Sequence, residues 1–390
     1  MSKTLQDYAI LINDTIQSNE INHYITTDNM CQNLGGIDTF KNINIPQGKV
    51  RSFQKDDILL SNIRLYFRKV YRAKQKGGCS SDVLVFRAKH IDSTTLFAIL
   101  SSQIFTDYAC SGSQGSKMPR GNKTHMMDFK IPTINFIIAK IFNSIQNKIE
   151  NNHKINELLH KILELLYEQY FVRFDFLDEN NKPYQTSGGK MKFSKELNRL
   201  IPNDFEVKTL GELITWISGS QPPKSCHIYE HKEGYIRFIQ NRDYSSNDYI
   251  TYIPISKNNK ICYQYDIMID KYGEAGAVRF GLQGAYNVAL SKISVLNQSM
   301  QEYIRSYLNS KPIKKYLSNA CMASTRSSLN ENHIHSLMLP IPPINLLQKY
   351  EKIAKNIITA IIKNNQSTQT LTALRDFLLP LLLKQQVKPQ

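Results

Sequence analysis

The chain has 390 residues, and its 49 Lys and Arg against 33 Asp and Glu give a formal net charge of +16 at pH 7. This length allows two ordinary domains, and the charge favours a polyanionic partner. Six widely spaced cysteines exclude a disulfide scaffold or a CxxC zinc site and indicate reduced thiols in a cytoplasmic protein. No signal peptide and no membrane span is expected, because no apolar run approaches 18 residues.

The chain contains an internal repeat with a period near 210 residues. Similar stretches recur in the same order: TLQDYAI with TLGELI, KDDILLSNI with YQYDIMIDK, and KIPTIN with PIPPIN. The offset is 205 residues from Thr4 to Thr209, 209 from Asp57 to Asp266 and 210 from Ile131 to Ile341. Such slow drift is typical of two copies with small insertions, and it indicates one duplication, not a solenoid.

The first copy, residues 1–135, contains short β-rich segments such as DVLVFRAK at 82–89, broken by Gly, Asn, Pro and Asp. These predict a compact mixed domain with short strands and a few helices. The alternative for each short segment is a buried turn of helix.

A basic stretch lies within this copy, with nine Lys and Arg against two Asp between residues 49 and 76. On a strand, Tyr66, Phe67 and Tyr71 would anchor inward while the interleaved basic residues project toward DNA phosphates or guanine edges. The alternative is a solvated edge strand whose charges discourage aggregation. The predicted DNA contacts in this stretch are Arg51, Arg64, Arg68, Lys69 and Arg72.

A Gly- and Ser-rich loop, CSGSQGSKMPRGNKTH at 110–125, adds Lys117, Arg120 and Lys123 to the predicted contacts. Flexible backbone with cations can approach a phosphate or a groove edge closely, although a plain surface loop is equally compatible with this composition.

A long helix is predicted over 136–172. Ile155, Leu159, Ile162 and Leu166 have the 4-3-4 spacing of a helix-pairing seam, which Lys148 and Asn152 interrupt. The following segment, 173–208, is rich in polar residues, Gly and Pro, and is interpreted as a connector.

The second copy, 209–343, repeats the pattern of short strands, with a tight turn at GEAGAV and a different loop at CMASTRSSLNENH. Its predicted DNA contacts are Lys271, Arg279, Arg326 and Ser327. Two differing loops in equivalent frames indicate two binding units with different targets.

A second long helix is predicted over 344–384, where Asn364 and Thr368 interrupt the apolar seam. Its predicted seam residues are Tyr350, Ile357, Ile361, Leu371 and Leu378. Matched lengths and matched polar breaks predict that the two helices pair in antiparallel fashion. The alternative is that each helix caps its own domain.

Motifs for catalysis are missing from the sequence. It has no GxxxxGK[ST], HExxH or GxSxG motif, and no Asn/Asp-Pro-Pro-Tyr/Phe tetrapeptide of an amino-methyltransferase. The nine histidines are scattered, which favours surface or packing roles over metal ligation. No catalytic residue, metal or cofactor is therefore expected on this chain.

Several stretches resemble the DNA-specificity subunit of type I restriction–modification systems, and the likeness covers essentially the whole chain. YFVRFDF to VKTLGEL resembles the inter-domain segment of that family, LPIPPINLLQKYEKIA its entry into the second helix, and LRDFLLPLLL its C-terminal end. TDNM…GGID, DDILLSNIRLYFRKV, GGCSSDVLVFR and GSKMPRGNK resemble one type of its recognition domain. Lys349 departs from the glutamine that is frequent at that position.

The resemblance implies an α+β fold in which two mixed α/β target-recognition domains form a pseudo-twofold repeat, separated by two long antiparallel coiled-coil-like helices. It also implies a non-catalytic subunit in which each domain reads one half of a split, asymmetric target in double-stranded DNA. The helices would dock two methylation subunits, and two restriction subunits can join them. S-adenosylmethionine, ATP and Mg would then be bound by those partners, which form an adenine methyltransferase and an ATP-dependent endonuclease.

Other interpretations stay open at this point. The chain could be the DNA-reading part of a single-chain restriction–methylation enzyme, but it lacks the methyltransferase motif that this predicts. It could also be a scaffold, which would bind DNA without regard to sequence and with a steep salt dependence. A further alternative is an orphan DNA-binding protein without a functional restriction partner.

Overall fold

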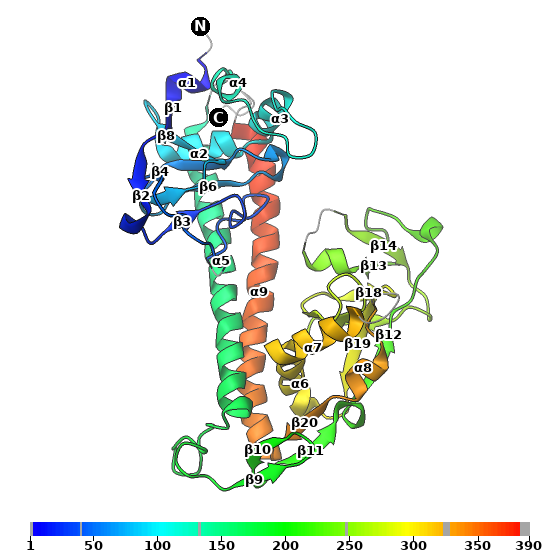
Figure 1. Ribbon diagram of the computed structural model, residues 1–390. Helices are drawn as coiled ribbons and strands as arrows, with labels where there is room; N and C mark the ends of the chain where they lie inside the picture. Colours follow the sequence, from blue (N-terminus) through cyan, green and yellow to red (C-terminus); the bar gives the residue numbers. More distant parts are fainter. Residues whose placement is uncertain (1–2, 40, 132–133, 246–248, 323–327, 383–390) are drawn as a thin grey trace. The chain divides into compact units, whose positions relative to one another are not determined.

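The computed structural model describes residues 3–39, 41–131, 134–245, 249–322 and 328–382. The chain divides into two compact units (Figure 1). Unit 1 comprises residues 1–156 and 364–390, and unit 2 comprises residues 157–363. Each unit therefore combines a mixed α/β part with a segment of each long helix.

Unit 1 contains two four-stranded sheets. The antiparallel sheet has the order β1 (Ala9–Ile12), β8 (Val83–Ala88), β5 (Ile58–Ser61) and β6 (Val70–Arg72). The other has the order β2 (Thr15–Gln17), β4 (Lys49–Phe53), β7 (Gly77–Cys79) and β3 (Tyr24–Ile25), in which β3 and β7 are parallel. The strand predicted at 82–89 is confirmed as β8.

Helices cover the antiparallel sheet of unit 1 because β5 and β8 place apolar side chains on that face. Ile58, Leu60 and Phe86 share one buried cluster with Leu96 and Phe97 of α2. The helices, seen in Figure 1, are α1 (Leu5–Tyr8), α2 (Ser93–Ser101), α3 (Gln103–Ser111) and α4 (Lys123–Met127). Asp92, Ser102 and Asn122 cap the last three by accepting hydrogen bonds from backbone N–H groups.

Unit 2 repeats this plan. Its antiparallel sheet has the order β12 (Ile214–Ser218), β19 (Leu290–Val295), β16 (Ile267–Asp270) and β17 (Val278–Arg279). Its mixed sheet has the order β14 (Thr251–Pro254), β13 (Tyr235–Ile239), β18 (Gly284–Tyr286) and β15 (Ile261–Cys262). The helices α6 (Gln301–Asn309), α7 (Lys311–Met322) and α8 (Glu331–His335) follow.

The internal repeat is visible in the strand order of the two units. The order β1-β8-β5-β6 corresponds to β12-β19-β16-β17 strand for strand. In the mixed sheets, β4, β7 and β3 correspond to β15, β18 and β13, with the same antiparallel and parallel pairings. The fourth strand differs, because β2 adds beside β4 in unit 1 whereas β14 adds beside β13 in unit 2.

The connector predicted at 173–208 is a folded part of unit 2. It contains the hairpin of β9 (Met191–Ser194) and β10 (Arg199–Pro202), and β11 (Glu206–Thr209) pairs with β20 (Met338–Ile341). Phe174 and Phe205 are buried and meet edge to face, with ring centroids 5.5 Å apart. These aromatic residues give the segment a core despite its polar composition.

The two long helices are α5 (Phe136–Tyr167), extended by a π-helical turn at Glu168–Val172, and α9 (Ile344–Leu382). In unit 1, α5 contacts α9 through Gln146 with Arg375 at 3.1 Å and Asn152 with Thr368 at 3.1 Å. In unit 2, Leu159 and Leu163 pack against Ile358, Ile361 and Ile362. The partner numbers fall as α5 advances, so the predicted antiparallel pairing is present within each unit.

The seam of α5 differs from the predicted one. Ala139 and Gln146 are buried in unit 1, and so is a run of residues spaced alternately by four and three: Ile138, Phe142, Ile145, Ile149, Asn152 and Asn156. Ile155 and Ile162, predicted for the seam, are instead 42% and 48% exposed. Leu159 and Leu166 are partly buried against the cores of unit 2. The prediction placed Asn152 outside the seam because asparagine is polar. As a result, the predicted seam positions of α5 were out of register with the observed ones.

On α9 the buried positions include Tyr350, Ile358 and Ile361, whereas Ile357 is half-buried. In the unit 1 segment, Leu371 is half-buried and Leu378 packs against the core. Three of the four residues that seemed to interrupt the seams are hydrogen-bonded across the helix pair: Asn152 donates to Thr368 at 3.1 Å, and Asn364 donates to Asn156 at 3.0 Å. The fourth, Lys148, is exposed. Paired amides satisfy one another inside an apolar seam and favour one register.

Candidate nucleic-acid interface

Three segments of unit 1 meet beyond the ends of its strands: the turn 26–29, the segment 61–69 and the loop 112–122. Lys69 Nζ donates to the carbonyl of Thr27 at 2.5 Å. The N–H of Arg64 donates to Pro119 at 2.9 Å, and that of Gly121 to Asn62 at 3.1 Å. We call these three segments the unit 1 surface.

Equivalent segments meet in unit 2, at the turn 240–243, the segment 270–277 and the described end of the loop at 328–330. The amide of Asn241 donates to the carbonyl of Tyr272 at 3.3 Å. The N–H of Leu329 donates to Lys271 at 2.9 Å, which is the counterpart of the bond from Gly121 to Asn62. We call these segments the unit 2 surface. The predicted contacts Arg326 and Ser327 lie outside the described residues.

The first turns of the two surfaces also correspond. Asn29 accepts a hydrogen bond from the N–H of Thr26, and Asp243 accepts one from the N–H of Gln240, both at 2.8 Å. Both acceptor side chains are buried. The two units therefore build the same loop framework, although little of the loop sequence is shared.

The middle segments have matching backbone conformations. Arg64 and Arg68 have φ of 50° and 49°, and the corresponding Gly273 and Gly276 have φ of 77° and 89°. Glycine adopts this left-handed region freely, whereas an arginine there is strained by its Cβ. Such strain is characteristic of functional sites.

Among the predicted contacts, those of the Gly/Ser loop face solvent. Lys117 and Lys123 are exposed, and the Arg120 side chain is 63% exposed although it pairs with Asp82 at 2.9 Å. An exposed pair of this kind contributes little to stability, so Arg120 can exchange Asp82 for a phosphate at small cost.

Several basic residues of the stretch 49–76, which was predicted to form a strand, donate hydrogen bonds within unit 1 instead. Arg51 donates to the carbonyl of Val83, Arg68 to Ser101 at 2.9 Å, and Arg72 to Thr94 at 2.7 Å. Burial lowers the pKa of Arg68 and of Lys69. Arg68 and Lys69 therefore attach the segment 61–69 to the rest of unit 1.

The aromatic residues of this stretch only partly follow the prediction. Tyr71 is buried, but Tyr66 is 53% exposed. The reason is that Leu65–Phe67 form a 3-10 turn and not a strand, so the alternation of inward and outward residues does not apply.

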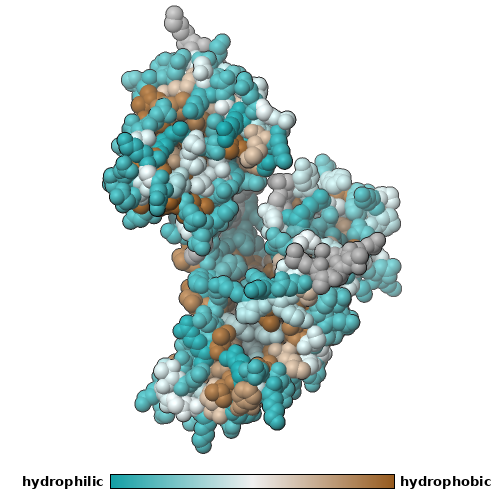
Figure 2. Space-filling model, viewed as in Figure 1, coloured by the Kyte–Doolittle hydropathy of each residue, from teal (hydrophilic) through white to brown (hydrophobic). Residues whose placement is uncertain are grey.

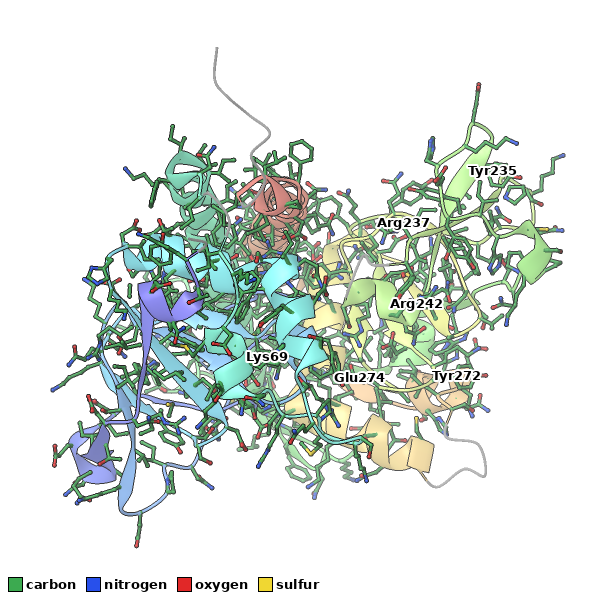
Figure 3. The ribbon with its side chains drawn as sticks, turned by 90° about the horizontal axis from the view of Figure 1, so that it is seen from above. Lys69, Tyr235, Arg237, Arg242, Tyr272 and Glu274 are labelled. Carbon is green, nitrogen blue, oxygen red and sulfur yellow. The ribbon has the colours of Figure 1, made fainter. Side chains whose placement is uncertain are left out.

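In unit 2, Arg279 pairs with Asp270 at 2.9 Å and with Glu274 at 2.6 Å, and the ammonium of Lys271 lies 6.0 Å from the ring of Tyr272. The sequence did not single out Arg242, which is exposed and lies 5.8 Å from the ring of Tyr249. Figure 3 labels Arg242, Tyr272 and Glu274 in unit 2, and Lys69 in unit 1. The turns at 26–29 and 240–243 share little sequence, so the sequence alone gave no signal for Arg242.

The side chains available here suit binding to a polyanion. Hydrophilic residues cover most of the face shown in Figure 2. Within the described part of the chain, no group of three His, Cys, Asp or Glu could hold a metal ion. Over the same residues, no helix is long and apolar enough to cross a membrane.

Comparisons with known proteins find similar sequences and a similar fold. Residues 202–373 match the family model described as the type I restriction modification DNA specificity domain. The type I restriction enzyme MjaIX specificity subunit of Methanocaldococcus jannaschii is 24% identical over 300 residues, which are 74% of this chain and 67% of that protein. The MjaVIII specificity subunit of the same organism is 22% identical over 179 residues, which are 45% of this chain and 41% of that protein.

A solved structure shares the fold. The crystal structure of a type I restriction–modification system S subunit from M. genitalium superposes with a TM-score of 0.64 at 16% identity, covering 99% of this chain and 96% of that one. The chain is thus similar, in sequence over residues 202–373 and in fold, to DNA-specificity subunits of type I restriction–modification systems.

Proposed function

We propose that unit 1 and unit 2 each read one half of a split, asymmetric target in double-stranded DNA. The observation that carries this proposal is the repeated surface. The same three segments, joined by corresponding hydrogen bonds, occur in both units with different side chains. Two sites that read different half-sites need the same loop framework with different side chains on it.

On each surface, cations that are exposed or half-buried would hold the DNA backbone. Lys117, Arg120 and Lys123 serve this role in unit 1, and Arg242 with Lys271 serves it in unit 2. Contacts to phosphate position a protein on the duplex without sequence preference, so neighbouring side chains must supply the discrimination between bases.

The long helices would fix the distance between the two half-sites. We propose that α5 and α9 hold the units in a pseudo-twofold arrangement at fixed separation, which sets the length of the unspecified spacer. The hydrogen-bonded pairs Asn152–Thr368 and Asn156–Asn364 support this role, because they disfavour sliding of one helix along the other.

The helices also offer a surface for partner subunits. On the unit 2 part of α5, Leu158, Ile162 and Leu165 are exposed at spacings of four and three residues, which places them on one face. We propose that methylation subunits dock on this face. The complex would then methylate adenine with S-adenosylmethionine held by those subunits, and restriction subunits would add ATP- and Mg-dependent cleavage.

The test is adenine-methylation mapping of a genome in cells that carry this chain with its methylation subunit, beside cells lacking only this chain. We expect a motif of two short specific blocks around a fixed spacer, lost when the chain is absent. Identical maps would refute the proposal and favour a scaffold or an orphan DNA-binding protein.

A further inference from the structure

One position of the repeated surface differs sharply between the units. The residue two places before the second left-handed position is Tyr66 in unit 1, before Arg68, and Glu274 in unit 2, before Gly276. Both are exposed, Tyr66 by 53% and the side chain of Glu274 by 77%. An exposed phenol and an exposed carboxylate therefore lie in the corresponding turns of the two surfaces, which differ in length by one residue.

Hydrogen bonds fix two neighbours of Tyr66 in the chain, Phe67 and Arg64. The carbonyl of Phe67 accepts from the N–H of Asn33 at 2.9 Å. The Arg64 guanidinium donates to the carbonyl of Lys117 at 3.4 Å. Ring contact with Phe67, at 4.7 Å between centroids, supports the phenol itself. Bonds to Asn33 and to Lys117 of the loop 112–122 thus fix the chain on either side of Tyr66, whose side chain stays exposed.

The loop that carries Glu274 is equally constrained. The N–H of Gly276 donates to Asp270 at 2.8 Å, and the N–H of Ala277 donates to Glu274 at 2.9 Å. A side chain at Gly276 would place a Cβ 2.9 Å from that of Leu317, so the turn packs closely on α7. Arg279 orients the Glu274 carboxylate at 2.6 Å while leaving it exposed.

The two side chains have different base preferences. A carboxylate is repelled by phosphates, but it can accept a hydrogen bond from the exocyclic amino group of cytosine in the major groove. A phenol offers a ring face and a hydroxyl that both donates and accepts. We infer that Tyr66 and Glu274 are specificity-determining residues, each contacting a base edge in the half-site of its own unit, with Glu274 accepting from cytosine.

This inference rests on the proposed split target. It is tested with the purified complex of this chain and its methylation subunits, on duplexes in which each base pair of the mapped motif is changed in turn. The variants are Tyr66→Ala, Tyr66→Phe, Glu274→Gln and Glu274→Ala. The matched controls are Phe193→Ala, another exposed ring, and Glu206→Gln, another exposed carboxylate with a cationic neighbour.

We expect each truncation to lower the preference for the cognate base roughly tenfold or more at one position of one half-site, as loss of a good base contact does. The two residues should affect opposite half-sites, and Glu274→Gln should lose discrimination at a C·G pair. The controls should leave all preferences within about twofold of the wild type.

Preferences unchanged at every position would overturn the inference. A uniform loss of affinity for all duplexes would also overturn it, because phosphate contacts or folding would then explain the effect. If the wild-type complex shows no split motif, the proposed function itself fails, and that result is distinct from either outcome.

Discussion

Replacing Ile361 by Ala tests whether the pairing of α5 and α9 stabilises unit 2. Ile361 is 1% exposed and belongs to the cluster that joins Leu159 and Leu163 of α5 to α9. Removing a buried isoleucine side chain loses apolar burial and leaves a cavity, so the expected cost is about 2–5 kcal/mol of unfolding free energy. The same change at Ile353, 41% exposed on the same helix, should cost less than about 1 kcal/mol.

The assay can be confined to unit 2. The chain has one tryptophan, Trp216, in β12, and it packs against the core of that unit. Urea unfolding followed by Trp216 fluorescence therefore reports the stability of unit 2 for each variant. The expected result is a lower midpoint for Ile361→Ala with an unchanged slope. Equal midpoints for the two variants would refute the proposed contribution of the seam.

Three further predictions follow from named contacts. Asn156→Ala should lower the unfolding free energy of unit 1 by about 1–3 kcal/mol, since the amides of Asn364 and Asn365 lose their partner. Calorimetry should show the loss as a lower melting temperature, and a gain in stability would contradict this prediction. Burial raises the pKa of Glu351 to about 7, above the ordinary carboxyl value of 4.5. The contribution of protonated Glu351 to the unfolding free energy should be fully present below pH 4.5 and should be lost as the pH rises to about 7. Glu351→Gln should flatten this profile in the Trp216 assay, and an unchanged profile would rule out Glu351. Lys117→Ala should weaken DNA binding at all sequences and reduce the slope of log affinity against log salt by about one, whereas Lys182→Ala, exposed on the connector, should not.

The fold was largely predictable because its signals are local or repeated. The β-rich composition of 82–89 predicted β8, and the Ile-Pro boundaries preceded both long helices. The polar breaks at Asn152 and Thr368 correctly indicated that the helices face each other. The register was wrong because a polar residue in a seam is indistinguishable, in one sequence, from a polar residue outside it.

The candidate site was less predictable. The excess of positive charge indicated a polyanion, but not which cations face solvent. Arg68 and Lys117 are both basic residues near the same turn, yet Arg68 donates to the carbonyl of Ser101 while Lys117 is exposed. A left-handed residue is also invisible in a sequence unless it is glycine, so the match between Arg64 and Gly273 emerged only from backbone angles.

The sequence by itself determined the duplication, the presence of two long helices and the DNA-binding character, since periodicity and net charge are properties of the chain. The tertiary structure decided the helix register, the folding of the connector and the exposure of Tyr66 and Glu274 in corresponding turns. These features depend on contacts between segments far apart in the chain. Hydrogen bonds and burial at those contacts determine which side chains face inward and which remain free to bind.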